Sequence, residues 1–145
     1  MLSLDDATRI IDTALAGARS DDSRRIAVCV VDAGGHPVAM KREADAPPLL
    51  SHIAEAKART CVLYGKPTKT VMEWADATPN WFHGVRDVAM ARAGLPLIGS
   101  LGGVIIRDGA GAVIGACGIA GEAGAFDQSL GVAGIEAAGF VADPG

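Results

Sequence analysis

The segment IAVCVVDAGGHPVAMKRE, residues 26–43, decides the fold class. Its first part, residues 26–32, is an unbroken apolar run rich in valine and isoleucine, which is typical of a strand covered on both faces. The sequence AGGHP at 33–37 has the chemistry of a turn, and VAMKRE at 38–43 predicts a returning strand. These residues therefore predict a β-hairpin and, with it, an antiparallel sheet.

A second hairpin is predicted near the C-terminal end. GVIIRD (103–108) and AVIGACGIAG (112–121) flank the turn sequence GAGA, and Gly102 and Gly103 open the first of these strands. Because no other segment has a comparable β pattern, two hairpins supply the predicted sheet.

Helical patterns precede, separate and follow the two hairpins. The first helix is predicted at about 4–19, behind a capping box formed by Ser3 and Asp6. The second begins at Leu49 and ends where Gly65 can adopt the left-handed conformation. A third helix is expected at roughly 127–138, with Asp127 as its N-cap and Gly139 at its end. The polar sequence SDDSRR (20–25) is a predicted connector.

Residues 66–100 are the least regular part. KTVMEWAD (69–76) is compatible with a short helix, and TPNWFHGVRDVAMARAG (78–94) with a loop that leads into another helix. LPLIGSLGG (95–103) has the composition of a loop. The combined pattern predicts an α+β fold whose antiparallel sheet is covered by helices or by another subunit.

Composition narrows the class of protein. The 145 residues suit a single domain, residues 1–145, and the formal net charge of −4 without a basic block disfavours nucleic acid and anionic membranes as partners. We expect no signal peptide, since the N-terminus lacks a basic and an apolar region, and no stretch of about 18 apolar residues that would span a membrane. The three dispersed cysteines form no C-x-x-C motif, so we expect a reduced, cytoplasmic protein without a metal site.

Lys57 interrupts the apolar stripe of the second helix. The stripe consists of Leu50, Ile53, Ala54, Ala58 and Cys61. In one interpretation the lysine stem covers apolar surface while the amine reaches water or a carboxylate. In the other, the amine lies at the floor of a pocket, where burial lowers its pKa and fits it for ligand binding or acid–base catalysis. Glu122 and Asp127 follow the last strand and are the candidate partners.

Other residues are candidates for ligand binding. The backbone at Gly102, Gly103 and Gly121 could approach a ligand, although glycines there also fit strand bulges or tight packing. His83, beside Trp81 in PNWFHG, fits a flat apolar ligand such as haem, but the same residues could plug the core.

Two further side chains and one exposed histidine complete the candidates. His52 is expected on the first turn of the second helix, away from its apolar stripe. Arg42 ends a strand and could hold a carboxylate, although an exposed arginine is also common there. His36 is expected in an exposed turn. The histidine spacing matches no metal motif, and neither a phosphate loop nor a dinucleotide fingerprint occurs.

Several stretches together resemble the GlcG/HbpS-like family, also called the haem-degrading domain family. They are VVDAGGHPVAMKREADA (30–46), AEAKART (54–60), GGVIIRDGAGAVIGACGIAG (102–121) and FDQSLGVAGIEAAG (126–139). The resemblance implies a profilin-like α+β fold with an antiparallel sheet, assembly into homo-oligomers, and haem as the one cofactor to consider. Lys57 matches the lysine of the family's K-A-x-T motif.

Two functions follow from these observations. The first is a small cytoplasmic ligand-binding protein of the haem-binding type, using Arg42, His52, Trp81, His83, Gly102, Gly103, Gly121 and Glu122. The second is an enzyme without an organic cofactor that transfers protons on a small oxygenated acid, as an isomerase, tautomerase or hydratase does, with Lys57 and Asp127 as catalytic residues. An accessory subunit that assembles through its small-residue faces is a third possibility.

Overall fold

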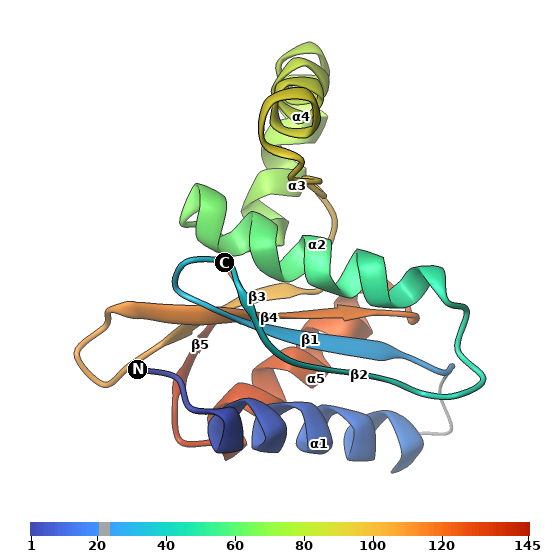
Figure 1. Cartoon of the computed structure of the whole chain (residues 1–145), viewed down its shortest axis with the longest axis vertical. Coiled ribbons are helices and arrows are strands. Elements are labelled where there is room, and N and C mark those ends of the chain that lie inside the picture. Colours follow the sequence, from blue (N-terminus) through green and yellow to red (C-terminus); the bar gives the residue numbers. More distant parts are fainter. Residues whose placement is uncertain (21–23) are drawn as a thin grey trace.

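The structure is a computed structural model that describes residues 1–20 and 24–145, and it contains an antiparallel sheet between helices (Figure 1). The predicted connector at 20–25 lies partly outside the described residues. The elements, in chain order, are α1 (Leu4–Ser20), β1 (Ala27–Asp32), β2 (Pro37–Arg42), α2 (Leu49–Tyr64), α3 (Thr68–Ala77), α4 (Pro79–Ala93), β3 (Gly103–Arg107), β4 (Val113–Ala120), α5 (Gly124–Ala137) and β5 (Val141–Asp143).

The five strands have the order β2-β1-β4-β3-β5, and all neighbours are antiparallel. Both predicted hairpins are present, and β1 of the first pairs with β4 of the second over residues 27–32 and 115–120. The predicted α+β class is therefore confirmed. The short edge strand β5 was not predicted, because three residues carry too little periodicity to indicate a strand.

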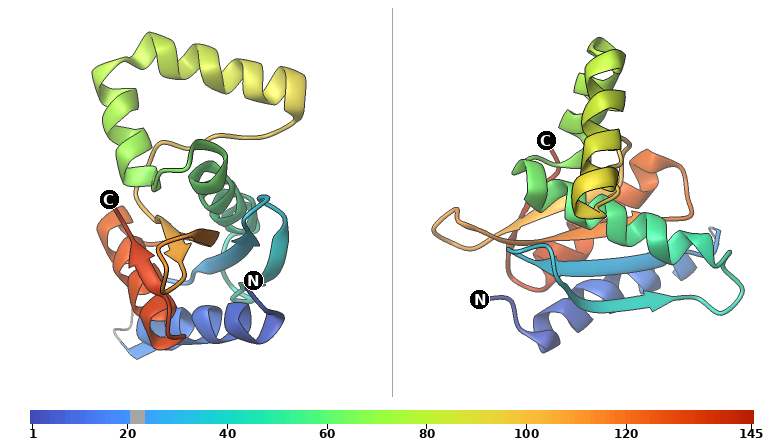
Figure 2. Two further views of the ribbon diagram at one scale, coloured as in Figure 1. Left: turned by 90° about the vertical axis from the view of Figure 1, so that its left-hand side faces the viewer. Right: turned by 45° about the horizontal axis from the view of Figure 1, so that its top comes forward.

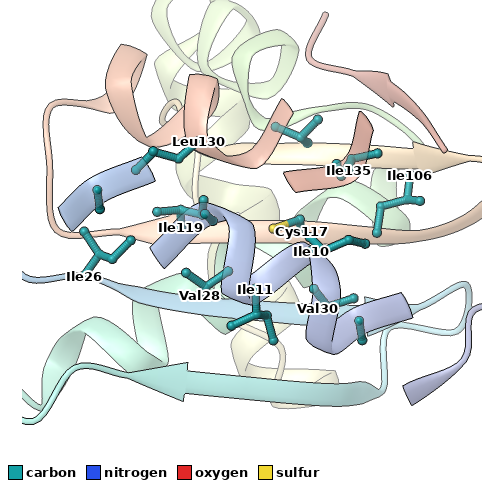
Figure 3. Close-up of a cluster of buried hydrophobic side chains, with 14 of the residues drawn as sticks. Ile10, Ile11, Ile26, Val28, Val30, Ile106, Cys117, Ile119, Leu130 and Ile135 are labelled. Atoms are coloured by element: carbon teal, nitrogen blue, oxygen red, sulfur yellow. The ribbon is translucent and has the colours of Figure 1, made fainter. Parts of the chain in front are cut away.

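Helices cover both faces of the sheet (Figure 1). Alternate residues of β1 point to opposite faces, as the pleat requires. Val28 and Val30 enter the core beneath α1 and α5 (Figure 3), whereas Cys29 and Val31 enter a second core beneath α2. The continuous apolar run of β1 is thus explained by two helical layers, without a second subunit.

Two predicted features near helix starts have different outcomes. The capping box of α1 is present, since the Asp6 amide donates to Ser3 Oγ at 3.1 Å and the Ser3 amide donates to the Asp6 carboxylate at 3.1 Å. The predicted N-cap role of Asp127 is wrong. Helix α5 begins earlier, with Ala123 as its N-cap, and places Asp127 inside its first turn.

Helices α3 and α4 form an arm that projects from the α2 side of the molecule (Figure 2). The loop predicted at the start of residues 78–94 is wrong, because α4 is helical from Pro79 onward. Proline at the first helical position favours this start, since its missing N–H would have no partner there and its φ suits a helix. Within the described residues, none of the helices combines the length and apolar character needed to cross a membrane.

Candidate functional site

The structure brings Lys57 and Asp127 together in a buried polar pair. Lys57 lies in the middle of α2 and Asp127 in the first turn of α5, on the other side of the sheet. The Lys57 amine lies 3.4 Å from Asp127 Oδ2 and donates to the backbone carbonyl of Ile119 at 2.7 Å. Lys57 is 5% exposed and Asp127 is 1% exposed. The lysine is therefore a buried, partnered cation.

Two further candidate residues surround this pair. Gly102 has a φ of +117°, and a Cβ atom there would lie 2.7 Å from the Lys57 amine and 2.7 Å from the Ile119 carbonyl oxygen. The backbone amide of Glu122 donates to Asp127 Oδ1 at 3.1 Å. Gly102 therefore leaves the space through which the lysine reaches α5, and Glu122 helps to hold the carboxylate that the lysine meets.

Burial dominates the electrostatics of the pair. It lowers the pKa of Lys57 from 10.5, and the negative charge of Asp127 opposes that change. It raises the pKa of Asp127 from 3.8 to about 6, with Lys57 again opposing. Each group is thus pushed toward its neutral form by the lack of water and toward its charged form by its partner. Two titratable groups in contact with pKa values perturbed by burial are common at acid–base sites and also in structural ion pairs.

The other predicted glycines are packed against the protein itself. The Gly103 amide donates to the buried Thr68 hydroxyl at 2.8 Å. Gly121 has a φ of +138°, and a Cβ atom there would lie 2.5 Å from the Arg25 carbonyl oxygen. The tight-packing interpretation of these glycines therefore has a direct physical basis, while their ligand-binding role remains a prediction.

Arg42 lies at the end of β2, as predicted, but its guanidinium group is directed to backbone carbonyls. It donates to Glu43, Ala44 and Ala46, the last at 2.5 Å. These bonds hold the turn that leads into α2. A carboxylate ligand of Arg42 would have to replace or share them.

Trp81 and His83 do not face one pocket. Both lie on α4, where successive residues turn by about 100°, so two residues apart they point in nearly opposite directions. Trp81 packs edge-on against Tyr64 and Trp74, with ring centroids 6.1 Å away in each case. It lines an open apolar hollow of about 430 Å³ together with Trp74 and Thr78. His83 is exposed and its Nδ1 lies 3.3 Å from the Arg86 guanidinium group.

His52 is exposed on the first turn of α2, as expected. The lining of neither hollow includes it, and it lies outside the Lys57 pair. No group of three or more metal-ligating side chains is found in residues 1–20 and 24–145.

A second hollow lies at the turn between β1 and β2, and sequence reasoning missed it. It has a volume of about 390 Å³ and a mostly apolar lining: Met1, Leu2, Asp32, Ala33, Gly34, Val38, Val113 and Ile114. Asp32 Oδ1 accepts hydrogen bonds from the amides of Gly34 and His36 and lies 3.3 Å from His36 Nδ1. The available signal was the spacing of Asp32 and His36 across a glycine turn, which lets an aspartate fold back on the backbone that follows it.

The fold defines the class of protein: an α+β protein of profilin-like architecture. Its distinguishing feature is the buried lysine–aspartate pair that connects the helices on the two faces of the sheet. Within that class, the chain belongs to the HbpS-like family, because the family model described as haem degrading protein HbpS-like matches residues 2–136. The family resemblance noted in the sequence is thereby confirmed.

Solved structures agree with this assignment. A double mutant of HbpS from Streptomyces reticuli is 26% identical, with a TM-score of 0.77 over 93% of this chain and 85% of that one. PduOC in complex with haem is 24% identical, with a TM-score of 0.81 over 96% of each chain. The protein ORFY of Klebsiella pneumoniae is 20% identical, with a TM-score of 0.80 over 94% and 89% of the two chains. No curated protein matches the chain.

Proposed function

We propose that this chain is a small haem-binding protein, formed by residues 1–145 as one domain and active in the cytoplasm as a homo-oligomer. Membership of the HbpS-like family and the likeness to the haem complex of PduOC support the ligand class. The three cysteines are free and buried, which agrees with a reducing compartment.

The histidine that best suits an iron ligand is His36. Histidines that bind metal commonly have their second ring nitrogen beside a carboxylate, which fixes the tautomer and the ring orientation. His36 Nδ1 lies 3.3 Å from Asp32 Oδ1, so its Nε2 is left to bind iron. Asp32 also lines the apolar hollow of about 390 Å³, a size within the usual range of ligand sites. His36 itself is exposed and does not line the hollow, so the contact of His36 with Asp32, which does line it, is the observation that carries the proposal.

His83 is less suited to the same role. The Arg86 guanidinium group can only donate, so its contact with His83 Nδ1 requires that nitrogen to accept. A His83 ring that bound iron through Nε2 would carry its proton on Nδ1 and would lose this contact with Arg86. The cysteines are excluded by their complete burial beneath the helices.

In the bound state, His36 would hold the iron, Asp32 would orient His36, and the apolar lining around Leu2 and Val38 would cover the ring. Haem held there would supply an iron centre for redox or oxygen chemistry. The contribution of the chain is to orient the histidine and to shield part of the ring from water.

The test is a haemin titration followed by visible absorption. We expect the wild type to shift the haemin band at a one-to-one ratio and His36→Ala to weaken binding at least tenfold. His83→Ala and His52→Ala are matched controls on other surfaces and should bind as the wild type does. An unchanged haemin spectrum with the wild type would overturn the proposed function, and normal binding by His36→Ala would overturn the assigned ligand.

A second candidate function is proton transfer on a small oxygenated acid, and the buried Lys57–Asp127 pair favours it. The opposed pKa changes of these two groups are typical of acid–base sites. The test is hydrogen–deuterium exchange of oxaloacetate and pyruvate in D₂O, observed by NMR. We expect exchange with the wild type and none with Lys57→Met; equal rates for the two proteins, or no exchange with either substrate, would exclude this function for these acids.

A further inference from the structure

Helix α4 is almost uncovered by the rest of the chain. Its 15 residues include one buried side chain, Phe82, and the whole arm stands away from the sheet (Figure 2). Helices of this length are marginal in water unless a face is packed against something. The arm is well placed to receive a partner, and its surface indicates which partner fits.

One face of α4 carries an apolar stripe. Trp81, Val85 and Val88 recur at helical spacing, and Arg92 ends the stripe one turn later. Trp81 is 43% exposed and Val88 is 62% exposed, whereas Val85 is half-buried, so the stripe is open to solvent at two of its three apolar positions. The open hollow beside Trp81 adjoins the N-terminal end of this stripe.

Gly84 lies between Trp81 and Val88 along the helix, at the edge of the stripe, and nothing within the described residues packs against it. A Cβ atom at Gly84 would meet nothing within 4 Å, and its φ is not positive. A glycine inside a helix costs about 1 kcal/mol relative to alanine. A glycine between exposed apolar residues fits a crossing point where another helix approaches closely.

We propose that α4 pairs antiparallel with the α4 helix of a second copy of this chain, with Gly84 at the crossing. If the two-fold axis passes between Gly84 and Val85, Trp81 lies opposite the partner's Val88. By symmetry, Val88 lies opposite the partner's Trp81 and can enter the hollow beside it. The surface is then self-complementary, as a two-fold interface must be.

The charges at the ends of the arm agree with this arrangement. In the antiparallel register Arg92 extends beyond the partner's Pro79, toward the corner where α3 ends and where the partner's Asp76 lies. Arg92 and Asp76 take part in no ion pair within the described part of the chain. A cation at this corner would also face the C-terminal end of α3, which carries negative partial charge.

The interface concerns only the homo-oligomer named in the proposed function and does not depend on haem. Its test is the mass of the purified protein by sedimentation equilibrium, starting from a chain mass of 14.7 kDa. We expect the wild type to have at least twice that mass. The Val88→Gln protein should have a smaller mass than the wild type. Met90→Gln is the matched control, because Met90 is 51% exposed on the opposite face of α4.

Two further variants distinguish an interface from a folding defect. Gly84→Gln should raise the helical stability of a lone chain, yet at a crossing point it should push the helices apart and lower the assembly mass. Arg92→Asp and Asp76→Arg should each weaken assembly, and the double variant should restore it. A monomeric wild type, or a Val88→Gln assembly of unchanged mass, would overturn the inference. The haemin titration of the same samples tests the proposed function separately.

Discussion

The amine of Lys57 and the carboxylate of Asp127, 70 residues apart in the chain, lie 3.4 Å apart between helices that cover opposite faces of the sheet. The lysine comes from α2 and the aspartate from α5, and the lysine can reach α5 because Gly102 has no side chain. The pair therefore joins the two helical layers at the end of β4. Whatever its chemical role, it is part of the structure that holds those layers in register.

The first prediction concerns the cost of breaking this pair. Asp127→Asn leaves a buried amine without its counter-charge, and Lys57→Met leaves a buried carboxylate. Each single variant should lose about 3–5 kcal/mol of unfolding free energy, the usual cost of an uncompensated buried charge. The measurement is urea unfolding followed by circular dichroism.

The double variant Lys57→Met/Asp127→Asn is the control for that prediction. It removes both charges and keeps an acceptor for the Glu122 amide, which now donates to Asp127. Because a buried ion pair can be replaced by neutral groups at little cost, the double variant should be more stable than either single variant. If the double variant instead lost as much unfolding free energy as the two single variants together, the charge left unpaired in each single variant would not be the cause of its instability.

The second prediction concerns pH. Burial raises the pKa of Asp127 from 3.8 to about 6, so the folded state binds more protons than the unfolded state between these values. The contribution of Asp127 to stability is therefore fully present below pH 3.8 and is lost as the pH rises through about 6. In Lys57→Met the opposing cation is absent, so this loss should be larger.

The measurement is the unfolding free energy of the wild type and Lys57→Met across that pH range. We expect the difference between them to be smallest at about pH 4, close to the unfolded-state pKa of 3.8, and larger at about pH 7, above the folded-state pKa of about 6. The Asp127→Asn protein has no carboxyl group at this position. Its unfolding free energy should therefore lack the pH dependence that Asp127 causes. A difference that widens on acidification would contradict the assigned direction of the pKa change.

The third prediction concerns the buried hydroxyl of Thr68. Thr68 Oγ1 accepts from the Gly103 amide at 2.8 Å, at the point where β3 begins beside the base of the arm. Thr68→Val keeps the shape of the side chain but leaves that buried amide without an acceptor. We expect a loss of about 1–3 kcal/mol in unfolding free energy.

Thr8→Val is the matched control for Thr68. The Thr8 hydroxyl donates to the Leu4 carbonyl within an exposed part of α1, where water can replace it. Valine and threonine have similar helix propensities, so the change should be within about 0.5 kcal/mol of the wild type. Equal losses in the two variants would argue that the Gly103 amide finds another acceptor.

Local patterns predicted the parts of the fold that depend on local chemistry. The two hairpins and helices α1 and α2 follow from turn residues, caps and apolar periodicity. Helix α4 was missed in its first turns because PNWFHG contains proline, asparagine and glycine, which usually mark loops. Its exposed apolar residues Trp81, Val88 and Met90 agree with a helix that the chain itself barely covers.

Part of the candidate site was also predictable from a local sequence pattern. Lys57 stands out because a charge interrupts an apolar stripe, and that single anomaly led to a buried residue. Its partner Asp127 was proposed from its place after the last strand, but its helical position was wrong by one turn. The contact of Asp32 with His36 had a signal in the sequence, but the hollow beside it did not, since the hollow depends on how Leu2 and Ile114 meet the turn from distant parts of the chain.

The last prediction tests how closely α2 lies on the sheet. A Cβ atom at Gly118 in β4 would lie 2.0 Å from the Ala54 carbonyl oxygen and 2.7 Å from the Ala58 amide nitrogen. Both atoms belong to the backbone of α2, which cannot move aside as a flexible side chain can. Gly118→Ala should therefore force α2 away from β4 and cost about 3 kcal/mol or more in unfolding free energy, at the upper end for overpacked cores.

Gly109→Ala provides the comparison, because a Cβ atom at Gly109 in the β3–β4 turn would meet nothing within 4 Å. This variant should unfold at nearly the same urea concentration as the wild type. Since Lys57 lies one residue from Ala58, displacement of α2 should also disturb the contact with Asp127, so Gly118→Ala should lose part of the pH dependence described above. A Gly118→Ala protein with wild-type stability would show that α2 does not rest on the backbone of β4.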